Sequence, residues 1–109
     1  MIYAVDFDGT LCAGCYPEIG EANWELIRFL RQERSLGNKI ILNTLREGER
    51  LQEALLWCSR QGLAFDAVND NLPEMKKRYG NNPRKINADH YIDDRNYGPE
   101  NIRLPGRAR

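Results

Sequence analysis

The chain has 109 residues, and 41% of them are hydrophobic, which fits one small domain with a single core. Its formal net charge is zero, and no stretch is long and apolar enough to be expected to cross a membrane. The three cysteines are an odd number, and the N-terminus has no basic region followed by an apolar core. We therefore expect a cytoplasmic protein without a signal peptide.

The zero net charge conceals an uneven distribution along the chain. Residues 1–75 hold seven basic and twelve acidic residues, whereas residues 76–109 hold nine basic and four acidic ones. Two interpretations are open. The two parts neutralise each other in the fold, or the C-terminal part presents a basic surface to a phosphorylated or polyanionic substrate.

Apolar runs and turn residues predict alternating strands and helices in chain order. The expected elements are a strand over 2–6, a loop to residue 20, a helix over 21–36, a strand over 39–44, a helix over 49–61, a strand over 65–68, a short helix over 73–79, a strand over 90–93 and a tail from residue 96 that is partly irregular, with a short edge strand over 102–104. This order predicts a single α/β domain over residues 1–109, with a Rossmann-like α/β/α arrangement and a parallel sheet covered on both faces.

Helical spacing and buried strand runs also identify a candidate core. Its expected members are Ala22, Leu26, Ile27, Phe29 and Leu30 on the first helix, Ile40, Ile41 and Leu42 on the second strand, and Leu51, Leu55 and Cys58 on the second helix.

Two carboxylates, Asp6 and Asp8, end the first strand. Residues two apart on a strand point to the same side, so the pair converges on one point unless Gly9 bends the chain first. Converging carboxylates repel each other unless a cation or a shared proton lies between them. Thr44 and Asp93 end two other predicted strands, and the carboxyl ends of parallel strands meet at one edge, where open α/β sheets bind ligands.

Three segments resemble motifs of the haloacid dehalogenase-like (HAD) phosphohydrolases. Residues 6–10, Asp-Phe-Asp-Gly-Thr, are similar to the first motif. Residues 40–44, an apolar strand ending in Thr44, are similar to the second, and residues 91–94, Tyr-Ile-Asp-Asp, to the fourth. The resemblance implies a HAD-like hydrolase with a three-layer α/β/α core, a phosphatase with nucleotidase-like features.

The resemblance also implies a role for each motif residue. Asp6 is expected to be the nucleophile that forms an aspartyl-phosphate, and Asp8 the acid that protonates the leaving alcohol and then the base that activates water. Thr44 is expected to hydrogen-bond a phosphoryl oxygen. The expected cofactor is Mg²⁺, bound by Asp6, the backbone carbonyl of Asp8 and Asp93, with Asp94 as a further ligand or the residue that orients a metal-bound water.

A basic residue between the second and fourth motifs should offset the phosphate charge. Lys85 precedes a segment that resembles the deoxyribonucleotidase branch of the family, Ala-Asp-His-Tyr-Ile-Asp-Asp-Arg over 88–95, and we choose it. An extended chain would place Lys85 roughly 26 Å from Asp93, so this choice needs a turn over 86–88. Lys76 and Lys77, just after the third strand, are the alternatives.

The short connections after the first and third strands leave no room for a cap domain, so we expect an open site. Open sites of this kind suit large substrates or use a partner subunit as a lid. The expected partner is a phosphorylated substrate, either a small molecule or a macromolecular phosphate such as a nucleic-acid end. Arg46 and Arg50, just past the second motif, are candidates to contact the substrate beyond its phosphate.

Two further alternatives remain open. Cys12 and Cys15 form a Cys-x-x-Cys segment, for which a zinc site, a redox role and an ordinary loop are the alternatives. A structural zinc site normally needs four ligands, and an ordinary loop is favoured. The expected activity is a Mg²⁺-dependent phosphomonoester hydrolase, and the alternative is a non-catalytic HAD-like module that binds a phosphorylated ligand or a protein partner.

Overall fold

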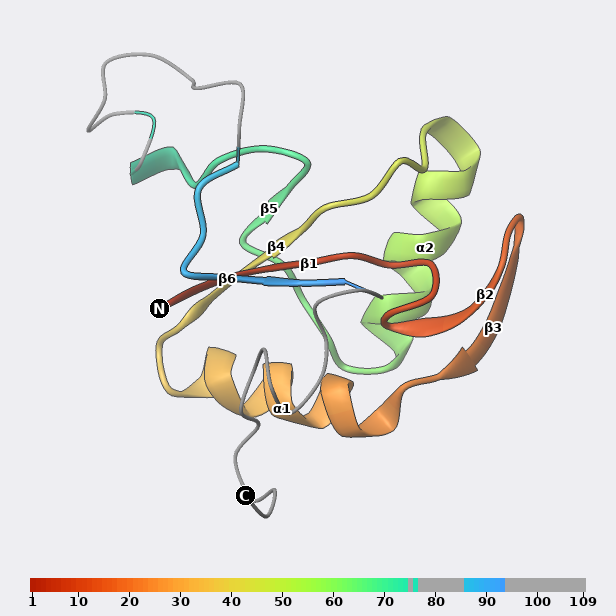
Figure 1. Cartoon of the computed structure of the whole chain (residues 1–109), viewed down its shortest axis with the longest axis horizontal. Coiled ribbons are helices and arrows are strands. Elements are labelled where there is room, and N and C mark those ends of the chain that lie inside the picture. The colour runs from red at the N-terminus through yellow and green to blue at the C-terminus, as the bar shows by residue number, and fades with distance from the viewer. Residues whose placement is uncertain (75, 77–85, 94–109) are drawn as a thin grey trace.

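The computed structural model describes residues 1–74, 76 and 86–93, and it has an α/β fold built on a parallel sheet (Figure 1). The elements are β1 (Ile2–Val5), β2 (Cys12–Cys15), β3 (Glu18–Ala22), α1 (Trp24–Ser35), β4 (Lys39–Leu42), α2 (Gly48–Arg60), β5 (Ala67–Val68) and β6 (His90–Ile92). Four strands form one sheet in the order β5-β4-β1-β6, and every neighbouring pair is parallel. The α/β fold and the parallel sheet predicted from the sequence are confirmed.

Strand β1 lies inside the sheet, between β4 and β6. Its register pairs Val5 with Leu42 on one side and with Ile92 on the other. All three side chains are buried. A strand that is paired on both edges and covered on both faces needs apolar residues at successive positions, which explains the continuous apolar run of β1.

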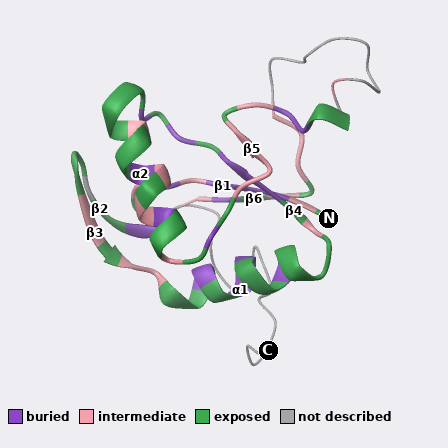
Figure 2. Ribbon diagram, turned by 180° about the vertical axis from the view of Figure 1, so that it is seen from behind, coloured by how far each residue is buried: buried purple, intermediate pink, exposed green. Residues whose placement is uncertain are grey.

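Both helices contribute to the core on one face of the sheet. This core contains Tyr3, Val5, Ile40 and Leu42 from the strands, Leu26, Ile27, Phe29 and Leu30 from α1, and Ala54 and Cys58 from α2. Figure 2 shows the buried residues of α1 on the side of the helix that faces the sheet. The apolar stripes predicted for the two helices are therefore confirmed except at Ala22, which lies in β3 and packs partly buried against the same core. Leu51 and Leu55 pack at the margin of this core.

The opposite face of the sheet has a smaller core. Leu72 packs there with Ala4 and Ile41, and Ile86 and Ala88 lie partly buried against them. The described cover of this face is thus the connection between β5 and β6. Residues 73, 74 and 76 are helical, as predicted, but the rest of the expected helix and the whole tail from residue 96 lie outside the described residues. The three-layer arrangement therefore stays a prediction.

The segment expected to be a loop contains an antiparallel hairpin of β2 and β3, which shortens the first helix. Helix α1 begins at Trp24 because Asn23 is its N-cap: the Asn23 side chain accepts a hydrogen bond from the Leu26 amide. The hairpin strands approach so closely that a Cβ at Gly20 would lie 2.6 Å from the Ala13 carbonyl oxygen. The prediction of a loop here is wrong, because residues 12–15 and 18–22 pair with each other and Arg46 donates hydrogen bonds to the carbonyls of Pro17 and Glu18.

The strand predicted over 65–68 is also shorter than expected, and β5 contains only Ala67 and Val68. The reason lies at Asp66, whose side chain accepts a hydrogen bond from the Ile40 amide at 2.8 Å and whose own amide donates to the Ile40 carbonyl. A side chain thus replaces one backbone partner at the start of this strand.

Among the described residues, no helix has both the length and the apolar character that membrane crossing requires.

A buried polar network surrounds the side chain of Tyr3, near the start of β1. The Tyr3 hydroxyl donates to the Glu33 carboxylate at 2.7 Å, and the Asn38 side-chain amide donates to the same oxygen at 3.0 Å. Tyr3 and Glu33 are both buried. Burial raises the pKa of Tyr3, and the hydrogen bond to Glu33 raises it further. The neutral phenol is therefore held in the folded protein.

Tyr3→Phe should destabilise the protein by about 1–2 kcal/mol near neutral pH, because the buried Glu33 carboxylate loses a donor. The raised pKa of Tyr3 means that the unfolded chain loses the phenolic proton first, so wild-type stability should fall above about pH 10. Urea unfolding as a function of pH should show a shallower alkaline decline in the variant. Equal slopes for the two proteins would contradict this account.

Candidate active site

Two predicted site residues, Asp6 and Asp93, come directly after neighbouring strands of the sheet. Val5 pairs with Ile92 in the register of β1 and β6, and the Asp6 amide continues the ladder by donating to the Ile92 carbonyl at 2.9 Å. Neighbouring strands are about 4.8 Å apart, so the two acidic residues start from adjacent backbone positions. The chain leaves β1 toward β4 on one side, whereas β6 joins on the other. Such a reversal of strand order is where open α/β sheets bind ligands.

Thr44 reaches the same edge from β4. The Asn43 amide donates to the Val5 carbonyl at 2.8 Å, which carries the pairing of β4 and β1 one residue past the strands. The Thr44 amide donates to the Asn69 side-chain oxygen at 2.7 Å, and the Thr44 hydroxyl oxygen accepts a hydrogen bond from the Arg46 amide at 3.1 Å. Thr44 is therefore held at its backbone amide by Asn69 and at its hydroxyl by the Arg46 amide.

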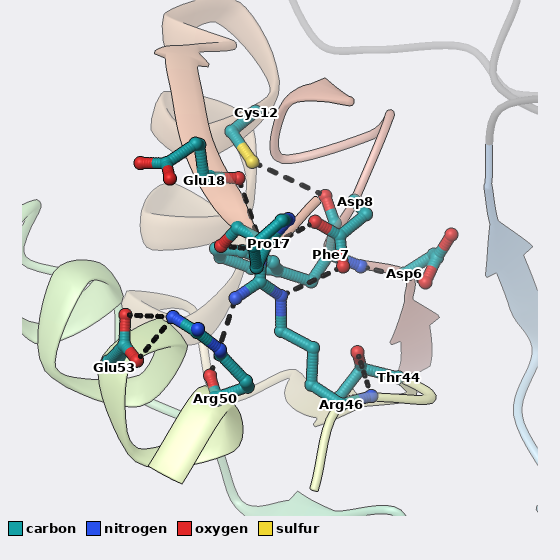
Figure 3. A network of polar contacts seen from close by, with 10 residues as sticks. All are labelled: Asp6, Phe7, Asp8, Cys12, Pro17, Glu18, Thr44, Arg46, Arg50 and Glu53. Atoms are coloured by element: carbon teal, nitrogen blue, oxygen red, sulfur yellow. Dashed lines mark hydrogen bonds and ion pairs between the residues drawn. The ribbon is translucent and has the colours of Figure 1, made fainter. Parts of the chain in front are cut away.

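The Asp8 carboxylate forms a bidentate ion pair with Arg46, as Figure 3 shows. Arg46 Nε donates to Oδ2 at 2.9 Å, and one terminal nitrogen of Arg46 donates to Oδ1 at 2.8 Å. The two residues are 38 positions apart in the sequence. Parallel paired hydrogen bonds of this kind are among the stronger polar contacts in proteins, since both partners are charged and their geometry matches.

The Arg46 side chain is buried, and its further contacts explain how a charge is accommodated there. The nitrogen that contacts Asp8 Oδ1 also donates to the carbonyls of Pro17 and Glu18 in the hairpin, at 3.2 Å each. The guanidinium lies 5.0 Å from the centre of the Phe7 ring and 4.9 Å from that of Tyr16. The hydrogen bond to Asp8 raises the pKa of Arg46, so the guanidinium stays charged.

The chain turns between Asp6 and Asp8, and this separates their side chains. Gly9 has a positive φ of 79°, and the amides of Thr10 and Leu11 both donate to the Phe7 carbonyl. In Figure 3, the Asp8 carboxylate faces Arg46, whereas the Asp6 carboxylate lies on the other side of the Phe7 backbone. The alternative in which Gly9 bends the chain is therefore the one that the structure adopts, and Arg46 rather than Asp6 is the neighbour of Asp8.

The position of Arg46 corrects the expectation that it contacts substrate directly. Its side chain is 1% exposed, so a ligand that approaches from solvent would contact Asp8 rather than Arg46. Arg50 differs, since it lies exposed on α2 and pairs with Glu53 at 3.1 Å. The sequence carries no signal for this difference, because a buried arginine and a solvated one look alike until the opposing carboxylate is known.

The donor set at this edge fits Mg²⁺. Asp6 and Asp93 supply carboxylates, and the engagement of the Asp8 side chain by Arg46 leaves its backbone carbonyl as the expected ligand. Within the described part of the chain, no three acidic, histidine or cysteine side chains gather into a metal cage. Mg²⁺ is commonly held by one or two carboxylates together with waters and substrate phosphates, so this sparse set suits it. Asp94 lies outside the described residues, and its predicted role is untested.

The predicted phosphate-binding lysine is also untested, since Lys85 and its alternative Lys77 lie outside the described residues. The third candidate, Lys76, is described and forms an ion pair with Asp70, just past β5. Its charge is therefore engaged by a neighbour on the same connection. The choice among the three lysines stays a prediction.

Cys12 is buried in β2, where its thiol contacts the Phe7 carbonyl. Burial raises the pKa of Cys12, and burial raises the pKa of Cys58 to about 12. Zinc and redox chemistry need the thiolate, which these surroundings disfavour. The structure supports a packing role for Cys12; the side chain of Cys15 is not among those described.

A solved structure of a conserved protein from Bacteroides thetaiotaomicron is similar to this chain. The two sequences are 42% identical, and the match covers 89% of this chain and 78% of that chain, with a TM-score of 0.76. The chain belongs to the family of that conserved protein. No protein-family model matches the sequence, and no curated protein matches it significantly. The similarity establishes the family of the chain, and the name of that protein states no activity.

Asn69 is a supporting residue that the sequence did not single out. It has a positive φ of 52°, a conformation that asparagine tolerates better than most residues, and its side chain fixes the Thr44 backbone. In the sequence, its place directly after β5 and before Asp70 is the feature that could have marked it as a turn residue. Asn69 is thus the structural support of one predicted phosphate contact.

Asn69→Ala should lower the free energy of unfolding by about 1–3 kcal/mol, because it removes the Thr44 acceptor and strains the backbone. Asn69→Gly removes the same acceptor but tolerates the positive φ, so it should lose less. Urea denaturation of both variants measures the difference. An alanine variant as stable as wild type would contradict the role given to Asn69.

Proposed function

We propose that the chain is a Mg²⁺-dependent phosphomonoester hydrolase of the HAD type that acts through an aspartyl-phosphate. The observation that carries the proposal is the position of Asp6 and Asp93 directly after adjacent parallel strands, at the point where the strand order reverses. Thr44 lies beyond the strand on the other side of β1. A nucleophile, a second carboxylate and a hydroxyl donor thus come from three strand ends at one edge.

In the first step, an Asp6 carboxylate oxygen attacks phosphorus, and a P–O bond forms as the bond to the leaving alcohol breaks. Asp8 donates to the departing oxygen the proton that it takes from water in the second step of the preceding turnover. In the second step, Asp8 takes a proton from water as that water attacks phosphorus, which restores the Asp6 carboxylate and releases inorganic phosphate. Bound Mg²⁺ would supply positive charge that lets the Asp6 carboxylate approach the anionic phosphate.

Thr44 is suited to bind a phosphoryl oxygen. A hydroxyl has one proton to donate and lone pairs to accept, and the Thr44 oxygen already accepts from the Arg46 amide. Its proton is thereby left to donate toward the phosphate. A lysine from the connection between β5 and β6 would add positive charge on the same group, and Lys85 is our choice.

The described residues after β1 form only the β2–β3 hairpin, and those after β5 form a short helical turn. This supports an enzyme without a cap domain, whose site is open to a phosphorylated small molecule or a macromolecular phosphate. A partner subunit could serve as the lid. A nucleic-acid end is one substrate within this class, suggested by the basic residues of 76–109.

A second candidate function is a non-catalytic module that binds a phosphorylated ligand or protein partner. One observation favours it: both Asp8 carboxylate oxygens contact Arg46, as in a purely structural ion pair. Turnover separates the two candidates, because a binding module would retain a phosphorylated ligand without releasing phosphate.

Asp6→Asn should lower the hydrolysis of an aryl phosphate on the order of 10³-fold, because an amide cannot act as the nucleophile. A chelator should abolish the wild-type rate, and added Mg²⁺ should restore it. Arg34→Gln, which breaks an ion pair with Asp66 far from the proposed site residues in the sequence, is the control and should leave the rate unchanged. Undiminished activity in Asp6→Asn would show the nucleophile to be wrong.

Lys85→Ala and Lys76→Ala, compared side by side, test the third motif. We expect the Lys85 variant to lose on the order of 10²-fold in kcat/KM, because phosphate charge is no longer offset in the transition state. Lys76→Ala removes the ion pair with Asp70 and should leave kcat/KM nearly unchanged. Steady-state kinetics on the same aryl phosphate decides, and the reverse order of losses would assign the motif to Lys76.

A further inference from the structure

The Asp8–Arg46 pair is arranged so that the arginine is hidden and the carboxylate is accessible. The Arg46 side chain is 1% exposed, whereas the Asp8 side chain is 27% exposed. Arg46 therefore holds Asp8 from the protein interior and leaves part of it open to a ligand.

Arg46 is itself fixed by groups from several parts of the chain. The hairpin supplies the carbonyls of Pro17 and Glu18 and the ring of Tyr16, and the ring of Phe7 contributes a second aromatic contact. These contacts restrict both the position and the plane of the guanidinium. Because a guanidinium binds a carboxylate in a fixed fork geometry, restricting its plane also restricts the orientation of Asp8.

We propose that Arg46 is a positioning residue that aims Asp8 at the leaving group, with the β2–β3 hairpin as its anchor. The inference rests on the proposed function and adds a residue to it that acts through Asp8 without touching the phosphate. Its consequence is chemical: Arg46 matters most where the leaving oxygen needs a proton. An alkyl phosphate, with a poor leaving group, needs that proton, whereas a nitrophenyl phosphate leaves readily without it.

The experiment compares kcat/KM for an alkyl phosphate and for 4-nitrophenyl phosphate. Arg46→Lys keeps the charge but cannot form the bidentate contact. We expect it to lose on the order of 10²-fold on the alkyl phosphate and only a few-fold on the nitrophenyl phosphate, in line with the usual contribution of a general acid. Asp8→Asn should show the same selective loss, and combining the two changes should add little, because they remove one shared function.

Tyr16→Ala keeps the test informative if the Arg46 variant does not fold. The Tyr16 side chain is exposed, so its loss is tolerated, yet it removes one of the two rings beside the guanidinium. We expect a smaller loss in the same direction on the alkyl phosphate. Arg34→Gln is the matched control, since it breaks a surface ion pair with Asp66 and should change neither rate.

Equal losses on the two substrates in Arg46→Lys and Tyr16→Ala would overturn the proposal, because a merely structural role lowers both rates alike. That result would leave the phosphatase assignment intact. If wild-type protein hydrolysed neither substrate in the presence of Mg²⁺, the proposed function would fail, and the positioning role would fail with it.

Discussion

The arrangement of the whole site depends on the pairing of β1 with strands on both of its edges. Val5 is aligned with Leu42 and Ile92, and the ladder continues one residue further through the amides of Asn43 and Asp6. In a parallel sheet the carboxyl ends of all strands lie at the same edge, so the polar residues that follow each strand also lie at that edge. A shift of register by one residue would turn every side chain of β1 to the other face and would separate these groups.

The second constraint is electrostatic. A partly buried carboxylate needs a compensating charge, and Arg46 provides it for Asp8. The compensation is costly to build, because a buried guanidinium must find hydrogen-bond acceptors. The hairpin supplies two of them through the carbonyls of Pro17 and Glu18. The hairpin, the arginine and the carboxylate are thus stabilised together, and the loss of any one leaves polar groups unsatisfied.

The two faces of the sheet contribute differently to this arrangement. Both α1 and α2 pack on one face, where the larger core holds the strands rigid beneath the site. The other face carries a smaller cluster around Leu72, from the connection that leads to β6. Loops that carry functional groups are commonly positioned by a rigid scaffold. Here the hydrogen bond from the Thr44 amide to the Asn69 side chain fixes the residue that follows β4.

The sequence by itself determined the α/β class, the parallel sheet, the apolar faces of both helices and the position of acidic and hydroxyl residues after strands. These features are local, since they depend on hydrophobic periodicity and on the residue types directly after each apolar run. Only the tertiary structure decided that residues 12–22 pair as a hairpin, that Asn69 supports Thr44 and that Asp8 faces Arg46 rather than Asp6. For the last two features the physical reason is distance along the chain: Asn69 lies 25 residues from Thr44 and Arg46 lies 38 from Asp8, and no local pattern encodes which distant partner a polar side chain will meet. The hairpin pairs residues no more than ten apart, but its two strands hold one β-branched residue, Ile19, so strand propensity does not predict them.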